Sequence, residues 1–447
     1  MSEQSVPHNG DADHSDEVVV TLDNALPMAM EFHQNGRWDD AEKIYLALLA
    51  HQPENSDALQ FLGVLRHNQG RNEDAINLLK QASALDPDNP GLLLNMGNVM
   101  IEAGDADEAV SVYQDVLKLA PKSAEAWSNA GVLLRTVGQL DLAEEALRKS
   151  IELNPEEAAP WHNLGNLLIS VDRVEEAVQC ALRATTYLPQ SRVGRKLLAT
   201  AYAYLGETEK AKEVLREWLE EIPGDPSAEH HLAALENRMP DRASDAYVET
   251  VFDNFALTFD SRLENLEYRA PELVQGAVAQ ILAGTDPIDI LDLGCGTGLC
   301  GPLVRPHAKT LVGIDLSQKM LDRAHTRKSY DTLEKAEFIA YLKTVPGGFG
   351  MVIAADALCY VGRMEEFSQN CFRALEPGGT LIATFEADPN GQDISLPHTG
   401  RYTHGDDYLR RTFQEAGFEI TALSSEVLRM ETAAPVNGWL LIATRPA

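Results

Sequence analysis

The apolar residues of this chain change their pattern near residue 250. Before that point the chain forms pairs of helical segments, and after it short apolar runs alternate with helical segments. Paired helices are typical of a repeat array, whereas strands that alternate with helices predict a parallel α/β sheet. At 447 residues the chain is also longer than one hydrophobic core usually serves. The sequence therefore predicts two domains of different architecture, joined by a linker at residues 238–250.

Alanine and proline recur every 34 residues in the first half of the chain without a gap. The two series are Ala41, Ala75, Ala109, Ala143, Ala177 and Ala211, and Pro53, Pro87, Pro121, Pro155, Pro189 and Pro223. A proline ends a helix, so each interval predicts one helical hairpin. Six hairpins fit residues 22 to about 225, and residues 225–237 read as a last helix that caps the array, so the whole array spans residues 22–237.

Glycine follows the same register at two further places in the repeat. One place turns the chain between the two helices of a hairpin, and the other lets the two helices pack closely. The turn series is Gly36, Gly70, Gly104, Gly138 and Gly206, with Asp172 in the remaining place, and the packing series is Gly63, Gly97, Gly131 and Gly165. This register resembles the tetratricopeptide repeat.

Asparagine occupies one place in three successive repeats, at Asn95, Asn129 and Asn163. At this spacing the side chains are expected to stack as a ladder, and amides suit the backbone of an extended peptide. The arrangement is similar to the asparagine ladder of O-GlcNAc transferases, which lines a peptide-binding superhelix. Asn98 and Asn166 add polar positions to the predicted groove. The alternative is that these asparagines bond only to neighbouring backbone between repeats.

The first predicted strand of the second region, PIDILDL, is followed by the glycine loop GCGTG. Asp292 stands at the end of this strand, and Leu299 occupies the place where a dinucleotide motif requires glycine. A second strand, LVGIDLS, ends in Asp315, near the spacing expected for an acid that binds ribose hydroxyls. The two acids together with this loop are a more specific sign of a cofactor site than the glycines alone.

This combination resembles the class I S-adenosylmethionine-dependent methyltransferases. The resemblance implies a Rossmann-like α/β domain at residues 251–447, with a seven-stranded, mostly parallel sheet and an antiparallel terminal hairpin. It also implies S-adenosyl-L-methionine as the cofactor, with an acid in the place of Asp292 holding the ammonium end. For the adenine amino group the resemblance offers Glu337, with Asp331 as the alternative. The implied cofactor site comprises Asp292, Gly294, Cys295, Gly296, Gly298, Asp315, Leu316, Met320, Glu337, Asp356 and Phe259.

The segment VFDNFALTFDSRLENLEYRAPELV, residues 251–274, precedes the first strand. It is similar to a helix that enzymes of this class place as a lid over the cofactor, with an aromatic-Asp step such as Phe259-Asp260. Together with the repeats, the chain looks like the predicted methyltransferases that carry tetratricopeptide repeats.

Methyl transfer is an in-line displacement at carbon, so the alignment of the reacting groups supplies much of the acceleration. A general base is not required. If one is used, the candidates are Asp356, His404, Tyr402 and Glu386, which fall at strand ends or in the loop after the fifth strand. No set of residues has the spacing of a metal site, so no metal is predicted.

Composition narrows the choice of partners and compartment. The 37 Lys and Arg residues against 69 Asp and Glu give a net charge of -32, which disfavours nucleic acids and anionic membranes as partners. Residues 1–21 predict a disordered acidic tail, and no apolar run is long enough to span a membrane. The five cysteines lack paired spacing, which fits reduced thiols in a cytoplasm.

Three functions remain open on the sequence. The first is an enzyme that methylates a protein, peptide or carrier-tethered acceptor recruited by the repeats. The second is a small-molecule O- or N-methyltransferase whose repeats serve assembly. The third is a repeat scaffold that binds the cofactor without catalysis. The intact acids and glycines disfavour the scaffold, and the asparagine ladder favours a peptide.

Overall fold

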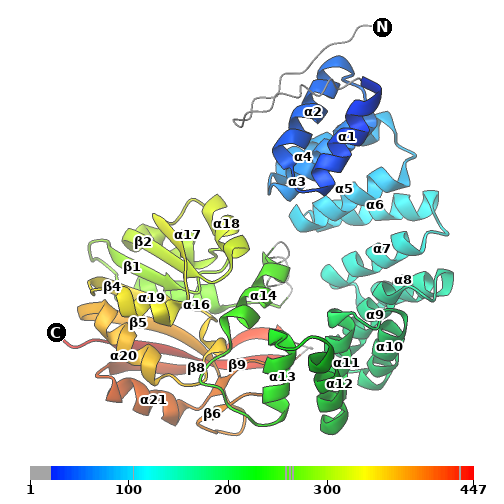
Figure 1. Ribbon diagram of the computed structural model, residues 1–447. Coiled ribbons are helices and arrows are strands. Elements are labelled where there is room, and N and C mark those ends of the chain that lie inside the picture. Colours follow the sequence, from blue (N-terminus) through cyan, green and yellow to red (C-terminus); the bar gives the residue numbers. More distant parts are fainter. Residues whose placement is uncertain (1–21, 104, 257–258, 261–262, 264–265, 432–433) are drawn as a thin grey trace. The chain divides into compact units, whose positions relative to one another are not determined.

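The computed structural model describes residues 22–447 except 104, 257–258, 261–262, 264–265 and 432–433 (Figure 1). The predicted tail at residues 1–21 and the turn residue Gly104 therefore lie outside the described residues. The chain divides into two compact units between Glu156 and Glu157.

Paired helices make up the described part of the first unit and the beginning of the second. The first unit contains α1 (Leu22–Gln34), α2 (Trp38–His51), α3 (Ser56–Asn68), α4 (Asn72–Leu85), α5 (Pro90–Ala103), α6 (Ala106–Leu119), α7 (Ala124–Thr136) and α8 (Leu140–Leu153). The second unit begins with α9 (Ala158–Ser170), α10 (Val174–Tyr187), α11 (Arg192–Tyr204), α12 (Thr208–Glu221) and the capping helix α13 (Pro226–Leu235). The predicted hairpins are thus confirmed.

The two glycine positions of the repeat act as the register predicts. The turn glycines Gly36, Gly70, Gly138 and Gly206 have φ angles between +74° and +77°. Asp172 takes the same left-handed conformation, with φ +61°. At the packing position, a Cβ on Gly131 would lie 2.6 Å from Leu147 Cγ, so only glycine allows this approach of the two helices.

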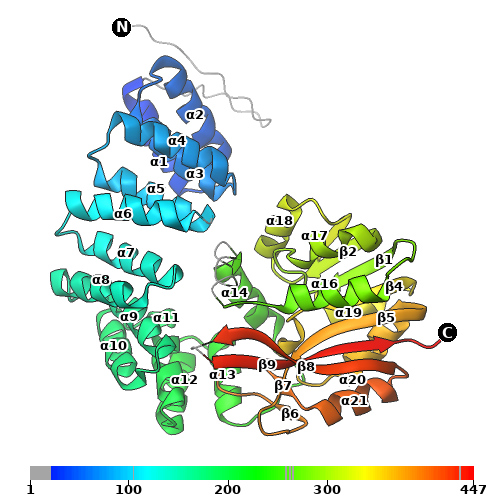
Figure 2. The same cartoon turned by 180° about the vertical axis from the view of Figure 1, so that it is seen from behind.

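A seven-stranded sheet forms the core of the remaining chain (Figure 2). Its strands are β1 (Ile288–Leu293), β2 (Ala308–Asp315), β3 (Thr332–Lys335), β4 (Phe349–Ala354), β5 (Leu375–Glu386), β8 (Glu419–Glu431) and β9 (Ala434–Thr444). They lie in the order β3-β2-β1-β4-β5-β9-β8. The pairs among β1 to β5 are parallel, while β9 is antiparallel to both β5 and β8. The predicted fold class is confirmed.

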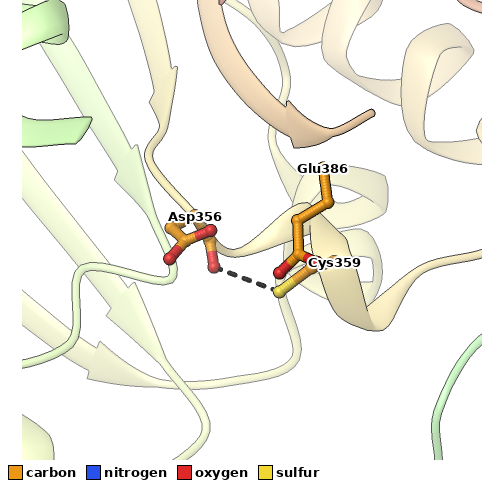
Figure 3. Close-up of side chains that lie close together, drawn as sticks. All are labelled: Asp356, Cys359 and Glu386. Carbon is orange, nitrogen blue, oxygen red and sulfur yellow. Dashed lines mark hydrogen bonds between the residues drawn. The ribbon is translucent and has the colours of Figure 1, made fainter. Parts of the chain in front are cut away.

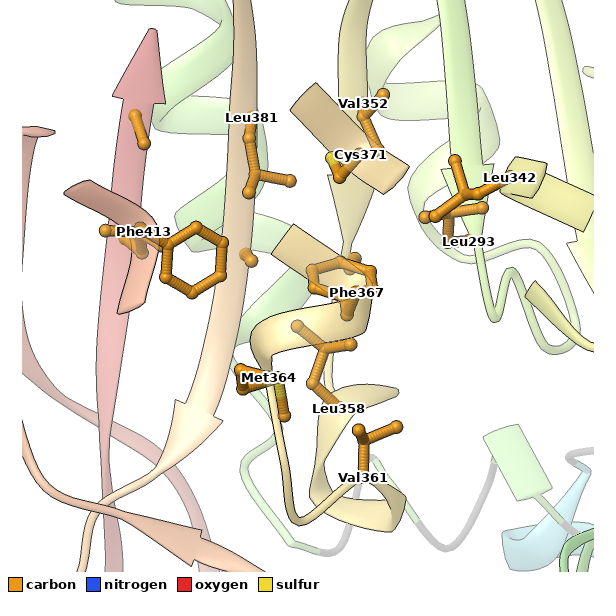
Figure 4. Packing of buried hydrophobic residues seen from close by; sticks show 14 of the residues in the cluster. Leu293, Leu342, Val352, Leu358, Val361, Met364, Phe367, Cys371, Leu381 and Phe413 are labelled. Carbon is orange, nitrogen blue, oxygen red and sulfur yellow. The ribbon is translucent and has the colours of Figure 1, made fainter. Parts of the chain in front are cut away.

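Helices cover both faces of this sheet. The remaining elements are α14 (Asp245–Phe255), α16 (Ala270–Ile281), α17 (Cys300–Val304), α18 (Gln318–Thr326), α19 (Phe338–Thr344), α20 (Glu365–Ala374), α21 (Asp406–Glu415), the 3-10 turns at Arg305–His307 and Leu358–Tyr360, and a small sheet of β6 (Ile394–Ser395) with β7 (Thr403–His404). On one face Phe367 of α20 and Phe413 of α21 pack in a cluster with Val352 and Leu381 of the sheet (Figure 4). On the other face Val278 of α16 belongs to a second cluster with strand residues.

The Pro-Gly-Gly segment at residues 377–379 lies inside β5. Pairing with β4 passes from Phe349–Leu375 directly to Met351–Thr380, which is a bulge. Gly378 takes φ +83° there. A bulge accommodates the extra residues without ending the strand.

The predicted linker at residues 238–250 is not a free connection. The backbone oxygen of Asp241 accepts hydrogen bonds from Gly362 N at 2.9 Å and Arg363 N at 3.0 Å, and Ala243 N donates to Tyr360 O at 2.9 Å. Helix α14 already starts at Asp245. The segment is ordered because its backbone groups pair with the chain after β4.

The capping helix and the last repeat pack on the sheet domain within the second unit. His230 Nε2 of α13 lies 2.8 Å from Gly400 O, and the rings of Tyr204 and His398 meet edge to face at 4.5 Å. This packing explains why the compact second unit begins inside the repeat array and not at the predicted linker. None of the described helices combines the length and apolar character needed to cross a bilayer.

Candidate active site

A cavity of about 420 Å³ lies at the carboxyl ends of the parallel strands. Residues that end or follow β1, β2, β3 and β4 contribute to its wall, as do α14 and one residue of the repeats, Lys196 of α11. Strand order reverses between β1 and β4, and ligands of open α/β sheets bind at such a switch point. The cavity is therefore the candidate ligand site.

The glycine loop after β1 exposes backbone to this cavity. Gly294 and Gly296 line the wall with φ +67° and +54°, conformations that favour glycine. A Cβ on Gly296 would meet nothing closer than Phe259 Cε1 at 3.9 Å, so the backbone faces open space. Cys295, between them, also lines the wall, and burial raises the pKa of its thiol.

Asp292 is 1 % exposed and lines the cavity. Burial raises its pKa to about 7, while a hydrogen bond from the Tyr330 hydroxyl to Asp292 Oδ2 at 2.7 Å opposes that rise. The nearby charge of Asp315 raises the pKa of Asp292 further. A cationic ligand stabilises the ionised form of such a buried carboxyl.

Asp315, at the end of β2, accepts hydrogen bonds from Gly296 N at 2.9 Å and Ser317 N at 2.8 Å. Burial raises its pKa. Leu316 and Glu337 also line the wall, and Glu337 caps α19 through Ile339 N at 3.0 Å and Ala340 N at 2.7 Å. This cap holds the Glu337 carboxylate at the end of β3.

Three residues considered for the cofactor lie outside the cavity wall. Gly298 is closely surrounded, because a Cβ there would lie 3.2 Å from Ala324 Cα. Met320 is fully buried in the protein interior. Asp331, the alternative to Glu337, instead pairs with Arg305 at 2.5 Å. Their roles are in packing and pairing, and the cavity does not reach them.

The predicted lid lies over the glycine loop where it is described. Phe259 lines the cavity, and Asp260 accepts hydrogen bonds from Thr297 Oγ1 and Arg327 Nη2, both at 2.5 Å. Phe252 of α14 meets the Phe259 ring edge to face at 5.9 Å. Residues 257–258, 261–262 and 264–265 of this segment lie outside the described residues. The aromatic-Asp step thus places the ring in the wall and fixes the acid to the loop.

A network of buried ion pairs lies beside the cavity. Arg429 Nη1 lies 3.0 and 2.9 Å from the two oxygens of Asp356, and its Nε lies 2.7 Å from Glu431 Oε1. Its other terminal nitrogen contacts Glu386. Arg401 links Glu386 and Glu431 at 2.6 and 2.7 Å. Burial raises the pKa of Asp356, and the charge of Arg429 opposes the rise.

Asp356, Cys359 and Glu386 point toward one another and offer ligand atoms within 4.8 Å (Figure 3). The Cys359 thiol donates to the backbone oxygen of Asp356 at 3.4 Å. Because Arg429 already contacts both carboxylates, the guanidinium supplies the positive charge that this group requires. We therefore assign no metal to it.

The four candidate bases fall in different environments. Asp356 lines the cavity, and Glu386 lies behind it in the ion-pair network. His404 is fully buried with Nε2 2.9 Å from Gly362 O, and burial lowers its pKa to about 4. Tyr402 is fully buried and donates to Pro240 O at 3.0 Å. The loop after β5 folds inward, so His404 and Tyr402 have no access to an acceptor, and neither can serve as its base.

The asparagines of the predicted groove differ in their contacts. Asn98 accepts a hydrogen bond from the Tyr113 hydroxyl, and Asn166 Nδ2 donates to His162 O at 3.2 Å. Asn95 and Asn129 in the first unit and Asn163 in the second are partly buried, and no side-chain hydrogen bond is found for them among the described residues. Those three amides remain available to a ligand, whereas Asn98 and Asn166 serve their own repeats.

Several residues of the wall were absent from the sequence-based site. They are Lys196, Arg242, Tyr247, Val251, Phe252, Tyr268, Arg401, Arg429 and Glu431. They come from α11, from the chain between the repeats and α16, from the loop after β5 and from β8, and only the tertiary fold brings them to the glycine loop.

The sheet order, the glycine loop and the two acids define a methyltransferase domain. A family model described as a methyltransferase domain matches residues 291–383, and one described as the cilia and flagella-associated protein 70 C-terminal domain matches residues 50–255. The chain belongs to the S-adenosylmethionine-dependent methyltransferases and carries tetratricopeptide-type repeats. S-adenosylmethionine is accordingly its cofactor.

Two curated relatives agree with this assignment. The ubiquinone biosynthesis O-methyltransferase of Thiobacillus denitrificans is 30% identical over 35% of this chain and 77% of its own length. A probable S-adenosylmethionine-dependent methyltransferase of Mycolicibacterium smegmatis is 27% identical over 35% of this chain and 61% of its own length. The chain spans 46% to 61% of the first curated relatives it matches. Among solved structures, Pseudomonas aeruginosa PilF is 19% identical with a TM-score of 0.41, covering 47% of this chain and 96% of PilF.

The residues of the cavity fit this cofactor. Glycine backbone leaves room beside the loop, and the carboxyls of Asp292 and Asp315 suit a ligand that carries an ammonium group and ribose hydroxyls. Phe259 and Leu316 provide apolar surface for a purine ring. When bound, the cofactor supplies an electrophilic methyl group.

Proposed function

We propose that this protein transfers the methyl group of S-adenosylmethionine to an acceptor group that a protein or peptide partner of the repeats brings to the cavity. The observation that carries the proposal is the position of Lys196. It belongs to the first helix of the sixth repeat, yet it lines the same cavity as Asp292 and Gly296. In this proposal the repeats bind the partner and also contribute a residue to the wall of the cavity.

The chain's own residues have two tasks in this reaction. The glycine loop and its acids orient the methyl donor, and the wall formed by α14 and Phe259 excludes water. Of the four candidate bases, Asp356 is the one that lines the cavity, so we assign it the role of accepting a proton from the acceptor, and Arg429 holds it in one orientation. An acceptor that is already deprotonated needs only alignment.

A free small-molecule acceptor is the second candidate. Aromatic side chains, among them Phe252, Tyr268 and Tyr360, make much of the wall apolar, which suits an aromatic or apolar acceptor. Some matched relatives are named for ubiquinone biosynthesis, squalene and botryococcene. In this case the repeats would serve assembly.

One experiment separates the two candidates. The full-length protein captures partners from a cell lysate, and the captured material is then incubated with S-adenosylmethionine labelled in its methyl group. Label in a captured protein, peptide or carrier supports recruitment by the repeats. Label only in a protein-free small-molecule extract, at rates that added repeats do not change, would replace the first candidate by the second.

A further inference from the structure

Four cationic side chains line the cavity, and three of them are paired with carboxylates. Arg242 contacts Asp245 of α14, and both Arg401 and Arg429 belong to the ion-pair network with Glu431. For the fourth, Lys196, no hydrogen bond or ion pair is found with any residue that the structure describes. Its ammonium group is thus the cation in the wall that lacks a protein counter-charge within the described chain.

The two histidines beside Lys196 do not provide that charge. Burial lowers the pKa of Lys196. Its ionisable neighbours His230 and His231 lie on the capping helix, and burial, followed by the charge of Lys196, lowers the pKa of His231 to about 3. A histidine is never negatively charged, so neither neighbour can act as a counter-ion. The site favours an anion that enters from the cavity.

An unpaired, partly buried ammonium group is costly to keep, and an anionic ligand that pairs with it recovers much of this cost. Lys196 lies on α11. The contact between the rings of Tyr204 and His398 fixes the packing of this helix against the sheet domain. The side chain is therefore held at the wall without a partner, as expected for a group whose partner is a ligand.

We propose that Lys196 is an anion-binding residue that the last repeat supplies to the methyltransferase cavity. The ligand group is a carboxylate or a similar anionic oxygen group. Two sources share this chemistry, the methionine carboxylate of the cofactor and an anionic group on the acceptor. Only the second source rests on the proposed function, because the cofactor is set by the family.

The test for the first source uses the full-length protein and two probes. S-adenosylhomocysteine contains the amino-acid carboxylate, whereas 5′-methylthioadenosine lacks the entire amino-acid part. If the cofactor is the source, Lys196→Gln lowers the affinity for S-adenosylhomocysteine by about 10- to 100-fold and leaves the affinity for 5′-methylthioadenosine unchanged. Lys196→Arg retains most of the affinity. The control is Lys210→Gln, which changes an exposed lysine of α12 that is paired with Glu207.

The test for the second source measures the reactivity of the Lys196 amine. The wild-type protein, saturated with S-adenosylhomocysteine, is labelled with acetic anhydride at several pH values, with acetate or inorganic phosphate added, and each lysine is quantified by mass spectrometry. An acceptor subsite predicts that the added anion protects Lys196 and not Lys210. Neither arm needs the acceptor, so failure to find a methylated partner leaves both readouts intact.

Two results overturn the proposal. One is wild-type affinity of Lys196→Gln for S-adenosylhomocysteine together with labelling of Lys196 that neither S-adenosylhomocysteine nor the added anions change. The other is an equal loss of affinity for both nucleoside probes, which would mean that the substitution disturbs the cavity as a whole. Thermal unfolding of each variant separates this disturbance from loss of the fold.

Discussion

The hydroxyl of Tyr330 donates a hydrogen bond to Asp292 Oδ2 at 2.7 Å, inside the protein and directly behind the glycine loop. Burial raises the pKa of Asp292 to about 7, and this hydrogen bond limits the rise. The carboxyl that we assign to the cofactor's ammonium group therefore changes charge near neutral pH. Its partner Tyr330 keeps the pKa of Asp292 lower than burial alone would make it.

Cofactor affinity should consequently depend on pH. Because the folded-state pKa of Asp292 is raised, the carboxyl is mostly protonated below about pH 7 and binds a cation poorly there. We expect affinity for S-adenosylhomocysteine to rise between pH 6 and pH 8, which calorimetry measures directly, with proton release on binding near pH 7.

Two variants control this prediction. Tyr330→Phe removes the bond that lowers the Asp292 pKa, so the rise in affinity should move to higher pH. Asp292→Asn should weaken binding and flatten the profile. A profile that is the same in wild type and Asp292→Asn would assign the titration to another group.

Two glycines of one loop should respond differently to substitution. A Cβ on Gly296 has open space in front of it, whereas a Cβ on Gly294 would lie 2.4 Å from the Ala357 Cβ. Gly296→Val should therefore fill the cavity and abolish most cofactor binding, at a stability cost of about 1–2 kcal/mol for the positive φ. Gly294→Ala should lower the melting temperature more strongly. Normal cofactor binding by Gly296→Val would show that the ligand does not approach this backbone.

Much of the fold follows from local sequence signals. The 34-residue steps place turn residues such as Gly70 and Asp172 where φ must be positive, and the acid at the end of β1 marks the glycine loop. Such signals depend on neighbours within a few residues, so they can be read without a tertiary structure.

The features of the site that the sequence does not predict depend on packing between distant segments. His404 and Tyr402 lie in the expected loop, but the sequence does not reveal that this loop turns inward to Gly362 and Pro240. Lys196 precedes the glycine loop by about 100 residues, and nothing in its helix marks the side chain that reaches the cavity. Residues 240–243 are likewise ordered because their backbone groups form hydrogen bonds with the chain after β4.

Removing the last repeats should destabilise the catalytic domain. The capping helix contributes Ala234 to a cluster with Leu396 and Tyr402, and His230 lies 2.8 Å from Gly400 O. A fragment of residues 157–447 keeps these contacts, while one of residues 241–447 exposes the apolar cluster and leaves the Gly400 oxygen without its partner. We expect the shorter fragment to melt at least several degrees lower in thermal unfolding. Equal melting temperatures would mean that the contacts are incidental.

The asparagines without internal hydrogen bonds should carry the affinity for an extended partner. Each of Asn95, Asn129 and Asn163 can exchange hydrogen bonds with a peptide backbone, at about 0.5 to 1.5 kcal/mol net per site. Because the three residues belong to different helices, their effects should be nearly additive. The triple alanine variant should therefore lose about 1.5 to 4.5 kcal/mol of partner binding on this principle, with cofactor affinity unchanged.

The other two asparagines provide the matched control for this groove. Asn98 accepts from Tyr113 within its own repeat, and Asn166 bonds to His162 O, so alanine at either place should lower thermal stability more than it lowers partner affinity. A partner held by the ladder raises the local concentration of its acceptor group near the cavity, and the loss of the ladder must then appear in kcat/KM at limiting substrate. We expect kcat at saturating partner to stay close to the wild-type value, since the chemistry lies at the glycine loop. If the triple variant methylates the captured partner with wild-type kcat/KM, the ladder does not hold the substrate, and the repeats act in assembly while a small molecule is the acceptor.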